Sequence, residues 1–285
     1  MSEPDDHVLR AITSDNTFRI IVASTAATVR GVIAAQQARG FTARCLSDLV
    51  TGIVLVRETM SPDHRVQGLL TGGGGRGRLV ADAHPDGSTR GLVQLPAGTS
   101  ELALGEGSTL QVMRTMASGA LYRGLVSAPE QGDVASALMS YFQESEQIVS
   151  VVGVATCERD GRVELAGGYV VQLLPEAERE ALRTMTERLA ALQDTAALLG
   201  RTRGAADAML AEIAGELEHA QLDDRPVRFR CWCTSDAVVA AIATLSRAEI
   251  AEILADDSEI EVSCDYCRTP YRVSRSRLQG LLEPS

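Results

Sequence analysis

The chain carries Cys231-Trp232-Cys233 near its C-terminal end and Cys264-Asp265-Tyr266-Cys267 after a spacer of residues 234–263. Two close pairs of thiols with a spacer between them are typical of a tetrahedral zinc site, because each pair supplies two of the four ligands. Buried thiols that served only as small apolar groups would be scattered along the chain. The pattern therefore predicts one zinc ion held by Cys231, Cys233, Cys264 and Cys267.

The residues around the two motifs predict a small module. Val227-Arg228-Phe229-Arg230 alternates as a strand. A strand would place Cys231 and Cys233 on one side, because successive side chains point to opposite faces. Ser246-Arg247-Ala248-Glu249 is a capping box, which predicts a helix start within the spacer. About 60 residues can hardly bury enough core unaided, so we expect the metal to stabilise this module.

Charge and composition argue against several classes of function. The 285 residues have a net charge of −11, and every basic residue is arginine. A nucleic-acid surface needs clustered positive charge to meet the phosphates, so no nucleic-acid partner is predicted. Residues 1–6 lack the pattern of a signal peptide, and apolar runs such as 53–56 are too short to cross a bilayer. We therefore expect a cytoplasmic protein without membrane contact, in which thiols stay reduced.

Residues 1–175 predict an α+β domain with mainly antiparallel strands and packed helices. His84-Pro85-Asp86-Gly87 is a typical hairpin turn between strands at 78–82 and 89–93. Further strands are predicted at 17–23, 110–115, 121–126, 148–157 and 162–174, and helices at 25–38, 42–59 and 133–146. Gly72–Gly77 lacks the Gly-Lys-Ser/Thr ending of a phosphate loop and precedes a strand, so it is read as a strand connection.

Residues 176–226 predict a helical linker. A helix is expected to begin at Pro175-Glu176-Ala177-Glu178 and to end at Gly200, with an apolar stripe from Leu182 to Leu199 that needs a partner surface. A shorter helix follows Gly204. Either the two helices form a hairpin packed on the N-terminal domain, or the segment is only marginally stable and detaches. The small C-terminal zinc-binding domain then occupies 227–285.

Oxidation would act as a switch on such a site. A disulfide is no longer a thiolate ligand, so pairing of the thiols would release the metal and melt the module. Cys45 and Cys157 lie outside the two motifs and are read as structural residues.

The chain resembles the redox-regulated holdase chaperones of the 33 kDa chaperonin (heat-shock protein 33) family. The cysteine motifs with the trailing Tyr271 carry the strongest resemblance. Residues 141–147 resemble the family's Tyr-Phe-x-x-Ser-Glu-Gln stretch, and residues 166–175 resemble its Ala-Gly-Gly strand leading into the linker. Residues 80–91 resemble its hairpin.

The resemblance implies a function. It implies an N-terminal substrate-binding domain, a metastable linker and a C-terminal redox switch whose reduced, zinc-bound form is inactive. Oxidation would join Cys231 with Cys233 and Cys264 with Cys267, release zinc and unfold the linker. Homodimers would then hold unfolding client proteins without ATP under oxidative stress.

Two other hypotheses stay open at this point. One is a constitutive zinc module that serves as an adaptor or assembly protein without redox switching. The other is a thiol oxidoreductase that uses Cys264 and Cys267. The four histidines, His7, His64, His84 and His219, are scattered and none is near a cysteine motif. The sequence therefore favours a protein that is not an enzyme.

Overall fold

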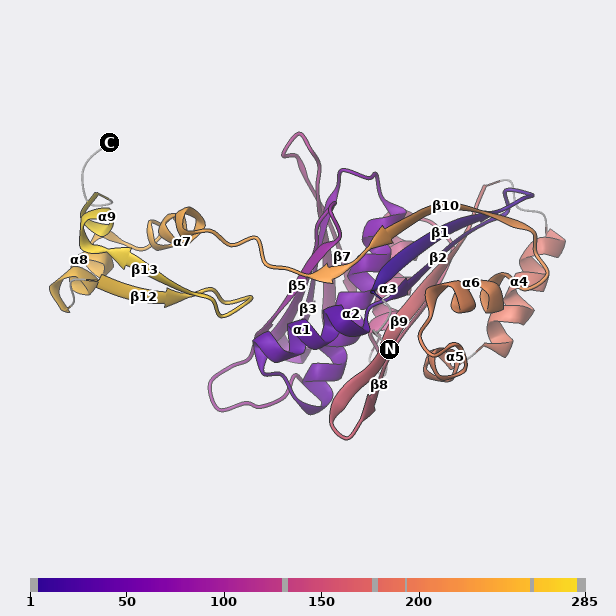
Figure 1. Ribbon diagram of the computed structural model, residues 1–285, viewed down its shortest axis with the longest axis horizontal. Helices are drawn as coiled ribbons and strands as arrows, with labels where there is room; N and C mark the ends of the chain where they lie inside the picture. The colour runs from indigo at the N-terminus through magenta and orange to yellow at the C-terminus, as the bar shows by residue number, and fades with distance from the viewer. Residues whose placement is uncertain (1–4, 130–132, 176–178, 193, 257–258, 281–285) are drawn as a thin grey trace. The chain divides into compact units, whose positions relative to one another are not determined.

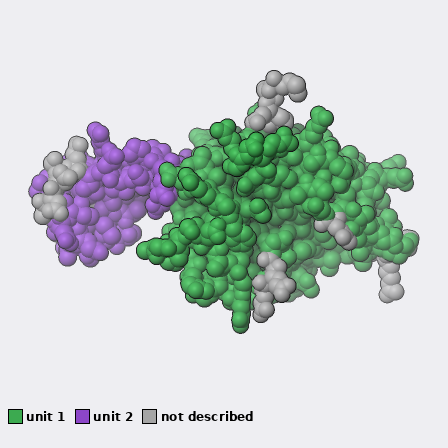
Figure 2. Space-filling model, turned by 90° about the horizontal axis from the view of Figure 1, so that it is seen from below, with its two compact units in different colours: residues 1–230 green, residues 231–285 purple. Residues whose placement is uncertain are grey.

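The computed structural model describes residues 5–129, 133–175, 179–192, 194–256 and 259–280 (Figure 1). The chain forms two compact units, residues 1–230 and 231–285, coloured separately in Figure 2. Antiparallel sheets with packed helices make up the first unit, and the four cysteines of the two motifs lie in the small second unit. These observations confirm the predicted α+β class.

A five-stranded antiparallel sheet forms one layer of unit 1, in the order β10-β1-β2-β9-β8. Its strands are β1 (His7–Thr13), β2 (Phe18–Ser24), β8 (Ser150–Arg159), β9 (Arg162–Leu173) and β10 (His219–Pro226). The sequence analysis did not predict β1 or β10. Strand β10 is exposed along most of its length, so its sequence lacks the apolar alternation by which strands are recognised.

A six-stranded sheet forms the second layer, in the order β11-β5-β4-β3-β6-β7. Its strands are β3 (Arg65–Thr71), β4 (Arg78–Ala83), β5 (Ser88–Gln94), β6 (Thr109–Thr115), β7 (Leu121–Ser127) and the short β11 (Arg228–Phe229). The hairpin predicted at 84–87 joins β4 to β5 and is confirmed. The Asp86 carboxylate accepts a hydrogen bond from the Ser88 amide at 2.9 Å and stabilises that turn.

Helices fill the space between the two sheets. Helix α2 (Gly40–Thr59) contacts β3 and β4 of one sheet and β8 and β9 of the other, with α1 (Ala26–Gln36) beside it. Helix α3 (Val134–Ser140) continues into a π-helical turn at Tyr141–Glu146. The main core of unit 1 is built around α2, most of whose residues are buried on every side.

The linker segment forms three helices that lie on the five-stranded sheet, α4 (Arg179–Ala191), α5 (Thr195–Thr202) and α6 (Ala206–Ala214) (Figure 1). It then adds β10 to the edge of that sheet. The single helix predicted up to Gly200 is therefore wrong. Asp194 interrupts it, because its carboxylate accepts hydrogen bonds from the Ala196 and Ala197 amides and starts α5 anew. The start predicted at 175–178 falls outside the described residues except for Pro175.

A second apolar core lies between these helices and the sheet. The sheet contributes buried residues of β1, β2 and β9, and the helices contribute theirs from the opposite side. The helical members are Met185, Leu189, Leu198, Leu199, Ala206, Met209, Leu210, Ile213 and Ala214. The predicted apolar stripe of the linker thus has a partner surface on the N-terminal sheet.

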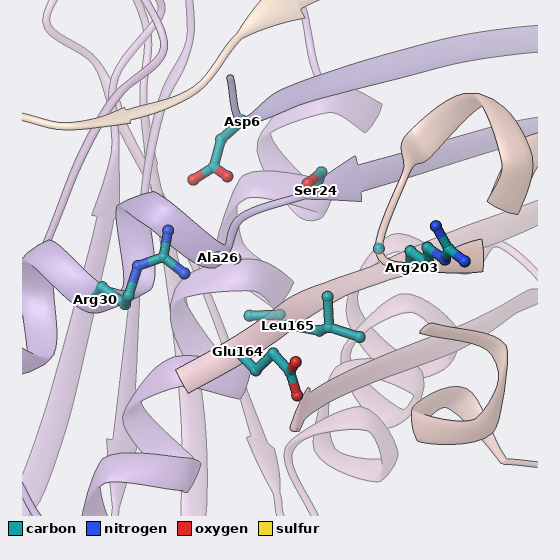
Figure 3. A pocket seen from close by; sticks show the side chains of 9 residues that line it. Asp6, Ser24, Ala26, Arg30, Glu164, Leu165 and Arg203 are labelled. Carbon is teal, nitrogen blue, oxygen red and sulfur yellow. The ribbon is translucent and has the colours of Figure 1, made fainter. Parts of the chain in front are cut away.

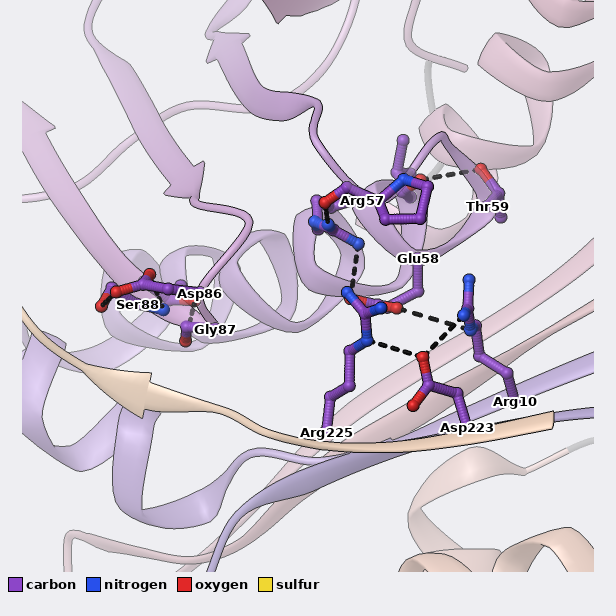
Figure 4. A network of polar contacts seen from close by, with 12 residues as sticks. Arg10, Arg57, Glu58, Thr59, Asp86, Gly87, Ser88, Asp223 and Arg225 are labelled. Atoms are coloured by element: carbon purple, nitrogen blue, oxygen red, sulfur yellow. Dashed lines mark hydrogen bonds and ion pairs between the residues drawn. The ribbon is translucent and has the colours of Figure 1, made fainter. Parts of the chain in front are cut away.

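A partly buried ionic network fastens β10 to the rest of unit 1 (Figure 4). The Asp223 carboxylate lies 2.7 Å from Arg10 of β1 and 2.6 Å from Arg225. The Arg10 guanidinium also lies 3.7 Å from the Glu58 carboxylate of α2. That carboxylate forms a second ion pair, at 2.8 Å, with the buried Arg57. Ionic groups shielded from water need partners, so the network ties the linker strand to the central helix.

Unit 2 is built from α7 (Ser235–Ile242), α8 (Arg247–Asp256), β12 (Glu259–Ser263), β13 (Pro270–Ser274) and α9 (Arg275–Gly280). The predicted capping box is confirmed, because the Ser246 amide donates to Glu249 at 2.8 Å and the Glu249 amide to the Ser246 hydroxyl at 3.3 Å. The buried core of this unit contains Val238, Ile242, Ile250, Leu254, Val273 and Leu278. So small a core gives the unit little stability of its own.

Candidate metal centre

The four cysteines of the two motifs meet at one point in unit 2. Their sulfur atoms all lie within 4.8 Å of one another. The sulfurs of Cys231 and Cys264 are 3.8 Å apart, and those of Cys233 and Cys267 are 3.5 Å apart. Both distances exceed the S–S bond length of about 2.05 Å, so all four are free thiols.

The spacing of the sulfurs fits a tetrahedral metal. Zinc–sulfur bonds of about 2.3 Å give a tetrahedron whose sulfur atoms are about 3.8 Å apart. The two measured distances lie close to that edge. Cysteine sulfur is also the ligand type that zinc prefers in closed structural sites. The residues present therefore fit one zinc ion.

The second motif is positioned by a tight turn between β12 and β13. The Cys264 amide donates a hydrogen bond to the Thr269 carbonyl at 2.9 Å, and the Arg268 amide donates to the Cys264 carbonyl at 2.8 Å. Arg268 adopts the left-handed conformation with φ of 59°, which lets the chain reverse after Cys267. The turn brings both of its sulfurs to the same side.

The first motif is positioned differently from the prediction. Strand β11 ends at Phe229, and Cys231 to Cys233 follow as irregular chain before α7 begins at Ser235. The two thiols therefore converge without the alternation of a strand. The Tyr271 side chain contacts the second of them, since its hydroxyl oxygen lies 3.0 Å from the Cys233 sulfur and 3.1 Å from the Cys233 carbonyl oxygen.

The pKa values of three of the four clustered thiols are shifted, and not all in the same direction. Burial raises the pKa of Cys233 to about 12 and raises the pKa of Cys264 as well. Burial opposes ionisation of Cys267 too, but hydrogen bonds from Thr269 outweigh it and lower the pKa of Cys267 to about 7. The Thr269 hydroxyl oxygen lies 3.1 Å from the Cys267 sulfur. These hydrogen bonds favour the thiolate form of Cys267.

Two hydroxyl groups at this site were not assigned a role by the sequence analysis. Tyr271 and Thr269 contact the sulfurs of Cys233 and Cys267, respectively. A hydroxyl group that is hydrogen-bonded to a ligating sulfur orients that ligand. The sequence signal is weak, because it consists only of a hydroxyl residue two or four positions after Cys267.

The other two cysteines lie in unit 1, apart from the cluster. Cys45 is buried on α2, and burial raises its pKa to about 12. Cys157 on β8 is half-buried, and its pKa is raised mainly by burial, with its sulfur 3.9 Å from the Ala196 carbonyl oxygen. Both thiols therefore stay protonated at neutral pH and behave as packing residues.

Among the described residues, Cys231, Cys233, Cys264 and Cys267 form the one cluster of histidine, cysteine or acidic groups that could hold a metal. A cavity of about 160 Å³ lies at the start of α1, between Asp6, Arg30, Glu164 and Arg203 (Figure 3). The Asp6 carboxylate is already used there, since it accepts hydrogen bonds from the Ala27 and Thr28 amides. In the described part of the chain, no helix combines the length and the apolar character that crossing a membrane requires.

Known proteins resemble this chain over nearly its whole length. The chain is 30% identical to the 33 kDa chaperonin of Syntrophotalea carbinolica, with 97% of this chain and 99% of the relative covered. It is 28% identical to the 33 kDa chaperonin of Clostridioides difficile, with 98% and 99% covered. A crystal structure of the 33 kDa chaperonin from Thermotoga maritima has the same fold, with a TM-score of 0.84 at 22% identity and 98% of each chain covered.

These relatives are named chaperonins and not enzymes, which agrees with the prediction that the chain is not an enzyme. A family model described as Hsp33 protein matches residues 6–274, a range that contains both cysteine motifs. The chain therefore belongs to the Hsp33 family.

Proposed function

We propose that this protein is a redox-regulated, ATP-independent holdase chaperone of the cytoplasm. The names of its relatives support a chaperone function, and a chaperone has unfolded or partly unfolded proteins as its clients. The observation that carries the redox part is the cluster of four free thiols in a unit with a very small core. Neither nucleic acid nor membrane is part of the proposal.

The four thiolates would hold one zinc ion in the reduced protein. When bound, zinc supplies a crosslink that joins the chain before α7 to the turn between β12 and β13. The two thiolates of a pair give two electrons to a molecule of peroxide, which takes up two protons from the solvent and becomes two molecules of water, while a disulfide forms. A disulfide no longer ligates the metal, so oxidation removes the crosslink.

Loss of this crosslink would free the linker. The proposed organisation is a substrate-binding domain at 1–175, a linker at 176–226 and a redox-switch domain at 227–285. Helices α4, α5 and α6 cover apolar residues of β1, β2 and β9. Detachment of these helices would expose a large apolar surface, of the kind that binds unfolded chains. The oxidised form is proposed to act as a homodimer under oxidative stress.

The pairing of the thiols can be read from a tryptic digest. All basic residues are arginine, so trypsin yields one peptide over 231–247 and another over 248–268. The proposed pairs Cys231–Cys233 and Cys264–Cys267 leave two separate peptides, each lighter by two hydrogen atoms. Crosswise pairs, which the distances of 3.8 and 3.5 Å also permit, would link the two peptides into one mass.

One experiment tests the function as a whole. The reduced, zinc-loaded protein is treated with peroxide or hypochlorite while zinc release and suppression of a client's aggregation are followed together. A holdase shows both effects, and a reductant reverses them. The Cys45→Ser/Cys157→Ser variant is the matched control, because it removes the two thiols outside the cluster and leaves the switch intact.

The alternative is a constitutive zinc module in an adaptor or assembly protein. One observation favours this alternative. The site has four sulfur ligands and no open position, and purely structural zinc sites have the same set of ligands. Such a module would keep its zinc under oxidants, or lose it without gaining the ability to hold clients. Either result in the experiment above would replace the holdase proposal.

A further inference from the structure

A cavity of about 470 Å³ lies in unit 1, between α1, the start of α2 and the β8–β9 hairpin. Its volume is within the range of roughly 300–1,000 Å³ that is typical of ligand pockets. Its floor is apolar and continuous with the main core, to which Ala43 and Val163 belong and against which Ile33 and Ala38 pack. None of its described lining residues belongs to the linker or to unit 2.

The walls of the cavity are held in place by the chain itself. Helix α1 ends at Gln37, whose left-handed conformation with φ of 51° turns the chain toward α2. On the opposite wall, Asp160 and Gly161 have φ values of 52° and 72° and close the tight turn between β8 and β9. The Arg30 guanidinium joins the two walls, because it donates a hydrogen bond to the Val163 carbonyl oxygen at 3.3 Å. The cavity is therefore preformed.

The lining of the cavity carries an excess of positive charge. Its three arginines and one glutamate leave a net charge of +2, in a chain whose net charge is −11. These residues are Arg30 of α1, Arg39 just before α2, Glu158 of β8 and Arg162 of β9. In the described part of the chain, no hydrogen bond or ion pair joins the guanidinium of Arg39 or Arg162 to another residue. Unbalanced positive charge beside an apolar floor fits a ligand that has a negative head and an apolar chain.

We propose that this cavity binds an amphipathic anion, with a carboxylate or phosphate head on an unbranched apolar chain. A guanidinium group presents its N–H donors as a planar fork that matches the oxygens of either head. An exposed ion pair contributes little by itself in water, so the head alone would bind weakly. Contact of the chain with Ile33, Ala38 and Val163 removes apolar surface from water and adds to the binding free energy. Binding of this ligand requires neither the zinc site nor the proposed redox switch.

Isothermal titration calorimetry on the full-length, reduced and zinc-loaded protein tests the class of ligand. The probes are octanoate and octyl phosphate, compared with octanamide, which lacks the charge, and acetate, which lacks the chain. All are used below the concentration at which micelles form. At least one of the two chain-bearing anions should have a dissociation constant about tenfold or more below those of octanamide and acetate. The tighter of the two identifies the head group. Failure of both to bind, or equal binding of octanamide or acetate, overturns the proposal.

Substitutions of charged residues locate the binding site. Arg39→Gln combined with Arg162→Gln removes both of these guanidinium groups from the cavity and should raise the dissociation constant of the tighter probe by about tenfold or more. Arg123→Gln removes an exposed guanidinium on β7, outside the cavity, and should leave that dissociation constant within about threefold of the wild-type value. Equal binding by the double variant and the wild type, or equal weakening by Arg123→Gln, overturns the site.

A second pair of variants separates charge from size. Ala34 of α1 lines the cavity and is exposed, so a longer side chain there can be accommodated by the helix. Ala34→Glu adds a negative charge to the cavity and should weaken binding of the anion more than Ala34→Gln, which adds a side chain of the same size without the charge. Circular dichroism and zinc content establish that each variant is folded. Equal weakening by the two substitutions would show that the cavity does not recognise the negative charge and would overturn the proposal.

Discussion

The hydroxyl oxygen of Tyr271 lies 3.0 Å from the sulfur of Cys233. The hydrogen bond to Cys233 raises the pKa of Tyr271 to about 12, so the hydroxyl keeps its proton at neutral pH. It donates that proton to the Cys233 carbonyl oxygen at 3.1 Å and can share it with the Cys233 sulfur when the sulfur is a thiolate. A thiolate that accepts such a bond carries less charge on sulfur and is harder to oxidise. The contact joins β13 to the first cysteine motif.

Tyr271→Phe removes this donor and leaves the ring. We expect zinc affinity to fall by about tenfold, because partners of metal ligands typically contribute 10–100-fold to affinity. Zinc release by peroxide should also become faster. Competition with a chromogenic chelator measures the affinity, and Tyr122→Phe, which changes a tyrosine of unit 1, serves as the control. Equal affinity and equal release rates in both variants would contradict the assigned role.

Cys264→Ser should abolish tight zinc binding and loosen unit 2 even under reducing conditions. The small core of this unit cannot replace a crosslink worth roughly 10–16 kcal/mol in small zinc modules. Limited proteolysis should then cut within 231–280 and within the freed linker, while the N-terminal domain remains intact. Cys157→Ser is the matched control and should bind zinc normally. Retained metal and unchanged protease resistance in Cys264→Ser would count against the four-thiolate site.

Arg188→Ala should release the linker without touching the metal site. The Arg188 guanidinium of α4 donates hydrogen bonds to the carbonyl oxygens of Glu212 at 2.7 Å and Ile213 at 2.8 Å, at the end of α6. These bonds satisfy carbonyl groups that a helix end leaves free, so their loss should cost about 1–2 kcal/mol.

The consequence of Arg188→Ala is measured in the reduced protein by binding of a dye that fluoresces on apolar surface. We expect more dye to bind, and zinc to stay in place. Arg183→Ala is the control, because Arg183 lies on the same helix and makes an exposed pair with Glu187. If both variants bind dye alike, Arg188 does not hold the linker closed.

Asp48→Asn should stabilise unit 1 at neutral pH. Burial raises the pKa of Asp48 to about 6, although the Thr156 hydroxyl donates to its carboxylate at 2.8 Å. A folded-state pKa above the unfolded value of 3.8 means that stability decreases as pH rises from about 4 to about 6 and stays lower above that range.

Asparagine carries no charge, so the gain at pH 7 should be about 1–3 kcal/mol and should vanish below about pH 4. Urea unfolding of unit 1 at pH 4 and pH 7 measures the difference. Asp63→Asn, which changes an exposed carboxylate, should alter stability by less than about 0.5 kcal/mol. A gain of equal size at both pH values would show that the charge of Asp48 is not its cause.

Local patterns in the sequence predicted much of this structure. The turn at 84–87 and the capping box at Ser246 and Glu249 are encoded within a few residues, so they could be recognised without knowing the fold. The meeting of the two cysteine motifs was predictable from ligand chemistry. The resemblance to the Hsp33 family was likewise carried by short motifs and is confirmed.

Features that depend on distant partners were not predictable in this way. β10 is a strand because β1 lies beside it and because Asp223 meets Arg10, a residue far away in the sequence. The break at Asp194 leaves the spacing of the apolar stripe almost unchanged, so periodicity alone could not reveal it. The irregular segment through Cys231 and Cys233 is hydrogen-bonded at Cys233 to Tyr271, which lies beyond the spacer.

The edge position of β10 has a mechanical consequence. Only residues 227–230 separate the end of β10 at Pro226 from Cys231, and β11 lies among them. If the chain loosens at Cys231, β11 and then β10 would separate from their neighbouring strands by breaking one backbone hydrogen bond after another. This takes less force than breaking all the hydrogen bonds of a strand at once. The ion pairs of Asp223 with Arg10 and Arg225 lie next along this path, and whether they break would decide whether the separation of β10 continues.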